Sequence, residues 1–371
     1  MTAPSRSVPF DIRHAEKNVM TALVQARNIY GGKRQIIVDG DERVLSYDDI
    51  LKASFALGSA LRKYAKKGEA VGVLLPTGVG AVIGFFALHA YGRVPAMLNF
   101  TAGEKGLKAA CKAAQIKTVV TAHKFVEVGK FEDLIAQMQD SVNFVYLEDV
   151  REKLSLFDKL HAIAGIYAPW AVAARRKPED VGVILFTSGT EGEPKGVVLS
   201  HKNLLANVEQ VRAHVAFHDS DIVFNPLPTF HCFGLTVGSL MPLMMGLKSV
   251  QHPSPLQART IAKRVKDSGS TILLATDTFI SQYARAGDQG DLNSLRLAVC
   301  GAERVRDETR AMIRKKYNIE ILEGYGVTEA APVVSANQIG ANKTGTVGRL
   351  LAGMEHKLEA VEGIPNAGRL H

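Results

Sequence analysis

The sequence VILFTSGTEGEPKGVVL, residues 183–199, joins two apolar runs through a polar loop. The apolar runs favour two short β-strands. The loop is rich in glycines and hydroxyl side chains, which let backbone amides and hydroxyls approach an anion closely, and Lys195 adds a positive charge suited to phosphate oxygens. A Walker A loop would continue with Ser or Thr and then a helix, whereas Gly196 and an apolar run follow here. The stretch therefore predicts a phosphate loop within a hairpin, although a polar turn with a solvated lysine would have a similar composition.

The composition is that of a globular protein with a large core. With 371 residues, 46% of them hydrophobic, the chain should form more than one lobe. Its three cysteines lie far apart without metal-ligand spacing, which indicates a reducing compartment and no disulfides. Residues 1–9 lack the apolar core of a secretion signal, and the apolar runs at 81–90 and 233–247 are shorter than the roughly 18 residues of a membrane span. The sequence therefore predicts a soluble, cytoplasmic protein.

The formal net charge is +8, and basic residues cluster at 62–67, 175–177 and 314–316. Cations that complement helix C-termini would explain these clusters. An acidic partner would explain them as well: an acyl carrier protein, an anionic membrane or a nucleotide. Nucleic acid is not expected, because no basic surface interleaved with aromatic residues is present.

Strand-like apolar runs alternate with helical periodicity along most of the chain, which predicts an α/β fold with parallel sheets covered on both faces. Residues 35–38 and 43–45 flank an Asp-Gly-Asp turn and predict a β-hairpin, with a capped helix starting at Ser46. Between residues 152 and 180 we expect a helix with an apolar face and a basic end. We interpret it as packing between two lobes, although it could instead lie on a membrane surface. Its apolar face would be made by Leu154, Phe157, Leu160, Ile163, Tyr167 and Trp170.

Two further motifs follow the loop in order: LPTFHCFG at residues 227–234 and EGYGVTE at residues 323–329. With the loop, they resemble the signature of the adenylate-forming superfamily, which includes acyl-CoA synthetases, luciferases and peptide-synthetase adenylation domains. The resemblance implies two doubly wound α/β lobes followed by the start of a truncated β-subdomain. We accordingly predict a flexible arm at 1–18, a first lobe at 19–170, a second lobe at 171–344 and the β-subdomain at 345–371.

The resemblance also implies a reaction and its cofactors, ATP and Mg²⁺. The enzyme would join a carboxylate to the α-phosphate of ATP and release pyrophosphate. Tyr325 would stack on adenine, Thr328 would bond the α-phosphate, and Glu329 with Thr190 would hold Mg²⁺, a hard cation that prefers oxygen ligands. The nucleotide-binding residues implied are Thr187, Ser188, Gly189, Thr190, Glu191, Gly192, Lys195, Gly301, Ala302, Glu303, Glu323, Gly324, Tyr325, Gly326 and Thr328.

In the superfamily the position of His231 borders the carboxylate and the acyl channel. The resemblance therefore implies that His231, Phe233 and Gly234 contact the acyl substrate, and that Lys195, His231, Thr328 and Glu329 are the catalytic residues. The apolar run that follows could line an acyl tunnel, in which unbranched methionines adapt to an alkyl chain, or it could form ordinary core. That run contains Leu235, Val237, Leu240, Met241, Leu243, Met244 and Met245.

Residues 95–103, 231–238 and 329–335 are similar, more narrowly, to bacterial acyl-acyl carrier protein synthetases, which serve 2-acylglycerophosphoethanolamine reacylation. This similarity implies a long-chain fatty acid substrate, acyl carrier protein or CoA as the thiol acceptor, and contact with the inner membrane through the rest of a parent protein. It also implies a ribose-binding aspartate and a mobile C-terminal domain with a catalytic lysine beyond His371, so we expect this chain alone to be nearly inactive. A CoA ligase and a non-catalytic nucleotide- or lipid-binding module remain alternatives. A P-loop kinase is disfavoured, because its lysine-Ser/Thr-helix pattern is missing.

Overall fold

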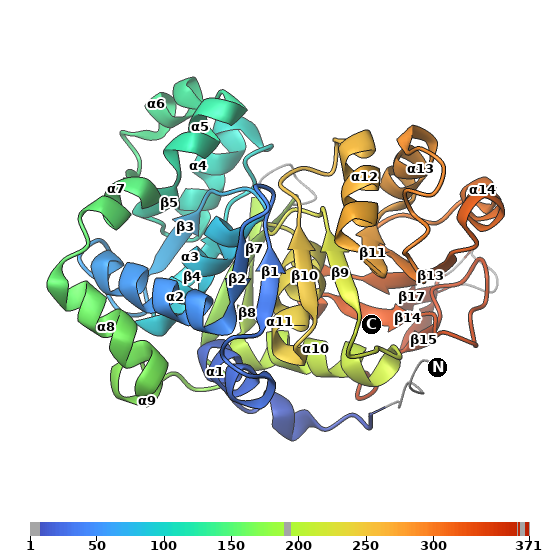
Figure 1. Ribbon diagram of the computed structural model, residues 1–371, viewed down its shortest axis with the longest axis horizontal. Helices are drawn as coiled ribbons and strands as arrows, with labels where there is room; N and C mark the ends of the chain where they lie inside the picture. The colour runs from blue at the N-terminus through green and yellow to red at the C-terminus, as the bar shows by residue number, and fades with distance from the viewer. Residues whose placement is uncertain (1–7, 189–193, 362, 364–367, 371) are drawn as a thin grey trace.

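The computed structural model describes residues 8–188, 194–361, 363 and 368–370. Within these residues the strands form a six-stranded sheet, a nine-stranded sheet and a two-stranded ribbon. Figure 1 shows the two large sheets side by side with helices around them. This architecture confirms the predicted α/β fold class.

The six-stranded sheet has the order β6-β5-β3-β4-β7-β8. Its neighbouring strands are parallel except for β7 and β8, which form an antiparallel hairpin. Its inner strands β3, β4 and β5 are buried along nearly their whole length, as expected for a sheet covered by helices on both sides. The strands are β3 (Ala70–Val73), β4 (Val94–Met97), β5 (Thr118–Thr121), β6 (Asn143–Tyr146), β7 (Val181–Ser188) and β8 (Pro194–Ser200).

The nine-stranded sheet has the order β15-β14-β13-β12-β11-β9-β10-β1-β2. Its central strands are parallel, whereas β1–β2, β13–β14 and β14–β15 pair antiparallel at the two edges. The sheets are therefore mixed rather than wholly parallel. The strands are β1 (Gln35–Val38), β2 (Val44–Ser46), β9 (Ile222–Asn225), β10 (Lys248–Gln251), β11 (Ile272–Ala275), β12 (Leu297–Cys300), β13 (Glu320–Gly326), β14 (Val333–Ala336) and β15 (Arg349–Leu350).

The helices divide the core into three clusters. One cluster joins residues of both sheets through the helices between them, a second lies under α12, α13 and α14, and a third lies under α4, α5 and α6. In β11, Ile272 and Leu274 enter the shared core while Leu273 and Ala275 face the outer helices, which is the alternation of a strand buried on both faces. The helices are α1 (Val19–Tyr30), α2 (Tyr47–Leu61), α3 (Val79–Ala90), α4 (Gly103–Ala113), α5 (His123–Gly129), α6 (Glu132–Met138), α7 (Leu147–Glu152), α8 (Leu156–Tyr167), α9 (Pro169–Val172), α10 (His201–His214), α11 (Met241–Met245), α12 (Ala258–Ser268), α13 (Asp277–Ala286) and α14 (Asp307–Tyr317), with the shorter η1 (Ile12–Ala15), the π-helix η2 (Phe233–Leu240) and η3 (Thr328–Ala330).

The chain crosses between the two sheets more than once. β1 and β2 complete the nine-stranded sheet, where Ile37 lies opposite Ser249 of β10, whereas β7 and β8 complete the six-stranded sheet. The predicted lobe boundary at residue 170 therefore does not coincide with a division between the sheets. The strands pair with partners far away in the sequence, which local patterns do not identify.

Two local predictions near the N-terminus have different outcomes. The helix predicted at Ser46 is confirmed, because the Asp49 amide donates to the Ser46 hydroxyl at 3.2 Å and the Ser46 amide donates to the Asp49 carboxylate at 2.9 Å. The expectation of a flexible arm is wrong for residues 12–15. These residues form η1, which is capped by Asp11, buries Ala15 and packs against α10.

The helix α8 lies at the outer edge of the molecule, against α2, and not between the two sheets (Figure 1). The interpretation of this segment as an interlobe helix is therefore wrong. Its buried positions are the small or polar residues Asp158, Ala162 and Gly165, and its large apolar side chains point outward.

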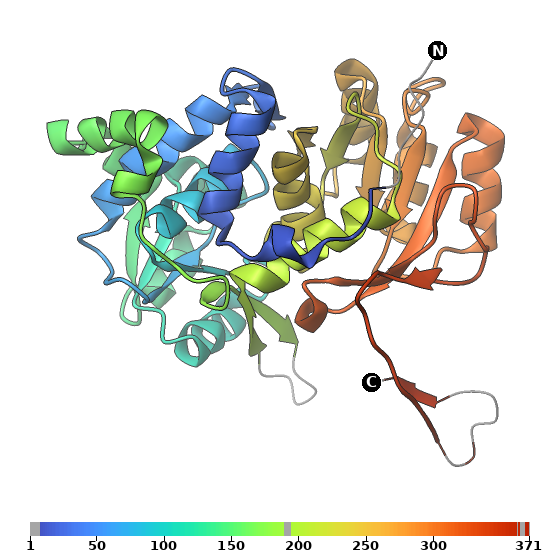
Figure 2. The same ribbon diagram turned by 90° about the horizontal axis from the view of Figure 1, so that it is seen from below.

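The last described strands, β16 (Leu358–Ala360) and β17 (Gly368–Leu370), form a ribbon that reaches away from the two sheets (Figure 2). The ribbon lies in the segment predicted to begin a β-subdomain. Among the residues described, we find no helix with the length and apolar character needed to cross a bilayer.

Candidate functional site

The phosphate-loop stretch forms the predicted hairpin. Strands β7 and β8 are antiparallel, with Thr187 opposite Lys195 and Ser188 opposite Pro194. Thr187 is half-buried and Lys195 is exposed beside the loop. The predicted nucleotide-binding residues of the loop itself lie outside the described residues; they are Gly189, Thr190, Glu191 and Gly192.

The second motif forms a tight turn between β9 and the π-helix η2. A Cβ atom on Gly234 would lie 2.3 Å from the carbonyl oxygen of Pro228, so only glycine fits there without a shift of the backbone. The turn is tied to the six-stranded sheet through Thr77, whose hydroxyl donates to the Leu227 carbonyl at 2.8 Å and accepts from the Thr229 amide at 3.1 Å. The motif is thus held at the junction of the two sheets.

His231 lies in this turn and exposes part of its side chain. Its ring centroid is 4.8 Å from that of Phe230. Although the ring is partly accessible, the surrounding protein reduces the hydration of the charged form and lowers the pKa of His231 below its usual value. The neutral imidazole can therefore act as a hydrogen-bonding group at neutral pH.

The third motif forms the end of β13 and the short helix η3. Tyr325 pairs with Ser335 of β14 and is 40% exposed. A Cβ atom on Gly326 would lie 2.4 Å from the Pro332 carbonyl oxygen, so the glycine permits close approach of the two backbones. Thr328 is half-buried and Glu329 is exposed on η3.

These segments converge in space. The sulfur of Cys232 lies 3.5 Å from the hydroxyl oxygen of Thr328, which joins the second motif to the third. A Cβ atom on Gly301 would lie 3.4 Å from the Phe233 ring and 3.7 Å from the Gly324 carbonyl oxygen. The helix η3 also lies beside β8, which carries Lys195. The structure therefore brings together the hairpin, the turn of residues 227–234 (the Phe233 turn), the loop after β12 and the end of β13.

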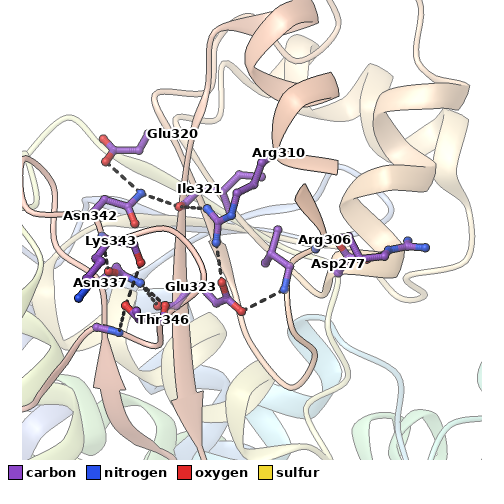
Figure 3. Close-up of polar contacts among 12 residues, drawn as sticks. Asp277, Arg306, Arg310, Glu320, Ile321, Glu323, Asn337, Asn342, Lys343 and Thr346 are labelled. Carbon is purple, nitrogen blue, oxygen red and sulfur yellow. Dashed lines mark hydrogen bonds and ion pairs between the residues drawn. The ribbon is translucent and has the colours of Figure 1, made fainter. Parts of the chain in front are cut away.

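Glu323, one of the predicted nucleotide-binding residues, uses its carboxylate inside the protein (Figure 3). The side chain is buried, accepts from the Val305 amide at 3.0 Å and pairs with the Arg310 guanidinium at 2.5 Å. Its backbone carbonyl accepts from both the amide and the side chain of Asn337. Its carboxylate is therefore engaged in a structural role, because it fastens the loop after β12 to β13.

The loop after β12 holds the predicted residues Gly301, Ala302 and Glu303. Ala302 has a φ of 65°, in the left-handed region that few non-glycine residues adopt. The Glu303 carboxylate accepts from the amide of Thr278 at 3.0 Å and from its hydroxyl at 2.8 Å. The loop is thus anchored by Glu303 on one side and by the Val305–Glu323 bond on the other.

Sequence reasoning missed the residues that support the site from behind. Arg310 and Asn337 hold Glu323, and Thr77 holds the second motif. None of these residues belongs to a recognised motif or repeats with the spacing of its partner. No local signal could have found them.

The apolar run after His231 is packed core. Leu235, Val237, Leu240, Met241 and Leu243 are all buried. A cavity of about 10 Å³ lies between this run and α3, which is room for no more than a water molecule. In this conformation the predicted acyl tunnel is closed. The run nevertheless begins with the π-helix η2, and π-helical turns occur frequently at functional sites.

Glu329 is a single exposed carboxylate, and no group of three metal-ligating side chains occurs among the described residues. Mg²⁺ bound to a nucleotide typically takes one or two protein carboxylates and completes its shell with phosphates and water. The donor set at Glu329 is compatible with such a nucleotide-bound ion.

A family model described as AMP-binding enzyme matches residues 24–368. The chain belongs to this family of AMP-binding enzymes. A long-chain-fatty-acid–CoA ligase from Bacillus subtilis (strain 168) is 26% identical to it over 370 residues, covering 92% of this chain and 65% of that protein. A 4-coumarate–CoA ligase from Vanilla planifolia is 26% identical over 348 residues, covering 88% of this chain and 61% of that protein.

A solved long-chain-fatty-acid-CoA ligase from Archaeoglobus fulgidus has the same fold, with a TM-score of 0.78 at 21% identity. The match covers 100% of this chain and 74% of that structure. Against the two curated ligases the chain spans less than two thirds of their length.

Proposed function

We propose that this chain carries the nucleotide-binding and acyl-activating residues of a fatty acid ligase, which forms acyl-AMP from a fatty acid and ATP with release of pyrophosphate. The observation that carries the proposal is the convergence of β8, the Phe233 turn, the loop after β12 and the end of β13. These segments come from distant parts of the chain and contain the motif residues Lys195, His231 and Tyr325, with Thr328 following on η3. Membership of the AMP-binding family and the similarity to fatty acid ligases support the same reaction.

Activation requires two anions, the carboxylate and the α-phosphate, to be held together while charge builds on phosphorus. Prepositioned donors lower the cost of that step. Thr187, Ser188, the loop that follows and Lys195 would bind the β- and γ-phosphates, and Thr328 would donate to the α-phosphate. Exposure of Lys195 beside the loop is compatible with this role.

The adenine would lie between the loop Gly301–Glu303 and the Tyr325 ring. A Cβ atom on Gly301 would be in ordinary van der Waals contact with the Phe233 ring and the Gly324 carbonyl oxygen, so this wall packs against both residues. Tyr325 offers an aromatic face for stacking, since it is partly exposed at the end of β13. Gly324 and Gly326 would let the β13 backbone approach the base.

Bound Mg²⁺ would neutralise phosphate charge. Glu329 would hold it, together with Thr190. His231, kept neutral by its lowered pKa, would donate or accept a hydrogen bond beside the fatty acid carboxylate. Phe233 and Gly234 would form the start of the acyl site, which must open between η2 and α3.

Two thiol acceptors fit the second half-reaction. The formal charge of +8 favours an acidic acyl carrier protein by electrostatic steering. The similarity to CoA ligases favours CoA. We propose the carrier protein as the acceptor and CoA as the second candidate, and a role in lysophospholipid reacylation follows only from the first.

The proposal is tested by calorimetry with MgATP and with a hydrolysis-resistant long-chain acyl-adenylate analogue, followed by product analysis. We expect the analogue to bind more tightly than ATP. The slow fatty-acid-dependent turnover expected of this chain alone should release pyrophosphate in the activation step and AMP once a thiol acceptor is present. Thioester formation with CoA or with acyl carrier protein then separates the two acceptors. Formation of ADP and phosphate, or failure to bind both ligands, would overturn the assignment.

A further inference from the structure

In helix α8 the large apolar side chains face outward, whereas small or polar residues face the protein. A surface helix normally turns its apolar stripe toward the core and its polar residues toward water. In α8 the inward positions are Asp158, Ala162 and Gly165, and a Cβ atom on Gly165 would lie 2.0 Å from the Phe55 ring. The small inward residues thus let α8 pack closely on α2 while the large apolar residues remain outside.

The outward face of α8 and α9 forms a continuous apolar stripe, which we call the α8–α9 stripe. Each of its side chains is between 51% and 82% exposed. Large exposed apolar side chains are common singly, but a contiguous row marks a surface that something covers. The members of the stripe are Leu156, Phe157, Leu160, Ile163, Tyr167 and Trp170.

Basic residues flank the stripe. Residues 151–177 contain six Lys or Arg and two Asp or Glu. One of the two acids, Asp158, is buried and accepts hydrogen bonds from Ser155 at the start of α8. In the described part of the chain, Lys153 and Lys159 are exposed and have no carboxylate partner. The surface around the stripe therefore favours an anionic partner.

A cavity of about 640 Å³ lies beside Phe157. The cations Arg62, Lys63, Arg93 and Lys153 line it, together with the acids Asp149 and Asp158. The Arg62 guanidinium lies 5.4 Å from the centroid of the Tyr91 ring. Positive groups thus stand directly next to the apolar stripe, as the headgroup phosphates of a lipid layer would require.

We propose that the α8–α9 stripe docks this protein on an anionic lipid bilayer, with the apolar side chains in the headgroup–acyl boundary and the flanking cations on lipid phosphates. An apolar helix face bordered by Lys and Arg is the arrangement of an interfacial helix, and Trp and Tyr favour that depth of the bilayer. The helices α8 and α9 lie at the outer edge of the molecule, away from the β7–β8 hairpin, so docking would leave the candidate site open (Figure 2). The proposal stands on this surface alone and does not depend on the ligase assignment.

The chain contains its own probe, because Trp170 is its single tryptophan. We expect vesicles of phosphatidylcholine with about one third phosphatidylglycerol to shift Trp170 emission to shorter wavelength, and the shift to weaken with added salt. Vesicles of phosphatidylcholine alone should cause a much smaller shift. Equal emission in buffer and with anionic vesicles would overturn the proposal.

A variant pair makes the test specific. Leu160→Gln with Ile163→Gln should reduce vesicle affinity at least tenfold, whereas Leu256→Gln, at a residue that is 73% exposed elsewhere, should leave it unchanged. Both variants should bind MgATP like the parent, which separates this proposal from the proposed function. If the double variant binds vesicles normally, or if it instead abolishes self-association measured by sedimentation, lipid docking through the stripe is wrong.

Discussion

The candidate nucleotide site and the α8–α9 stripe are two exposed regions built in opposite ways. The site draws residues from four distant segments and depends on buried contacts behind it, such as the Arg310–Glu323 pair. The stripe comes from one continuous segment, residues 156–170, whose outward apolar side chains are each more than half exposed. Substitutions behind the site should therefore change folding and nucleotide binding together. Substitutions in the stripe should change only what the surface binds.

The largest effect is expected from breaking the buried ion pair behind the site. Arg310→Met leaves the buried Glu323 carboxylate without its cation, which typically costs about 3–5 kcal/mol. We expect the urea midpoint to fall accordingly and MgATP affinity to fall with it, because the loop after β12 loses its anchor.

The matched control is Arg314→Met, at an exposed position of the same helix, which should leave both quantities unchanged. Replacing both partners, Arg310→Met with Glu323→Leu, should recover part of the stability, since no charge is then left buried. Equal midpoints for the parent and Arg310→Met would show that the pair does not support the site.

A pH titration probes a different part of the interior, where the centroid of the His201 ring lies 4.9 Å from that of the His89 ring. His201 starts α10 directly after β8, and burial lowers its pKa to about 4 from the usual 6.5. Between these values the unfolded chain binds the proton and the folded protein does not, so stability should fall as the pH falls. The loss attributable to this group is up to about 3 kcal/mol.

His201→Gln should reduce the slope of the unfolding free energy against pH between about 6.5 and 4. Part of the slope should remain, because burial also lowers the pKa values of His89 and His252. His356→Gln, at an exposed position, serves as the control. An identical slope for the parent and His201→Gln would contradict the assignment of the loss to His201.

The sequence predicted much of the fold, because strands and helices are local. The β1–β2 hairpin, the capped start of α2 and the β7–β8 hairpin all follow from short patterns. The pairing of β1 with β10 does not, because it depends on how distant segments pack. The position of the site could be predicted only from the three sequence motifs. Arg310 and Asn337 could not be predicted as parts of it, because they contact Glu323 through tertiary contacts and have no characteristic sequence spacing from it.

The interpretation of α8 failed for a different reason. Periodicity identifies an apolar face but not which way it points, and the usual expectation is inward. Here Asp158, Ala162 and Gly165 share the opposite face and allow close packing on Phe55. That row of small residues was the available signal, and it indicates which face of α8 is buried.

A smaller loss of MgATP affinity is expected from replacing Lys195, at the surface of the site. Lys195→Ala should weaken MgATP binding by about 2 kcal/mol, the contribution of one hydrogen bond to a charged group. It should leave the urea midpoint unchanged, because Lys195 is exposed. Calorimetry measures the MgATP affinity. Lys263→Ala, at another exposed lysine, is the control. Unchanged affinity would remove Lys195 from the phosphate site.

The smallest effect on stability is expected in the stripe. Leu160→Gln with Ile163→Gln replaces side chains that are 54% and 51% exposed and that make few of the contacts on which α8 depends. Surface substitutions of this kind usually change stability by less than about 0.5 kcal/mol, so the urea midpoint should stay close to that of the parent while vesicle binding is lost. A change of about 2 kcal/mol or more would mean that the stripe packs against the protein in solution, since losses of that size come from core packing. The α8–α9 stripe would then contribute to folding, as the contacts behind the nucleotide site do, and the two regions would not differ in this respect.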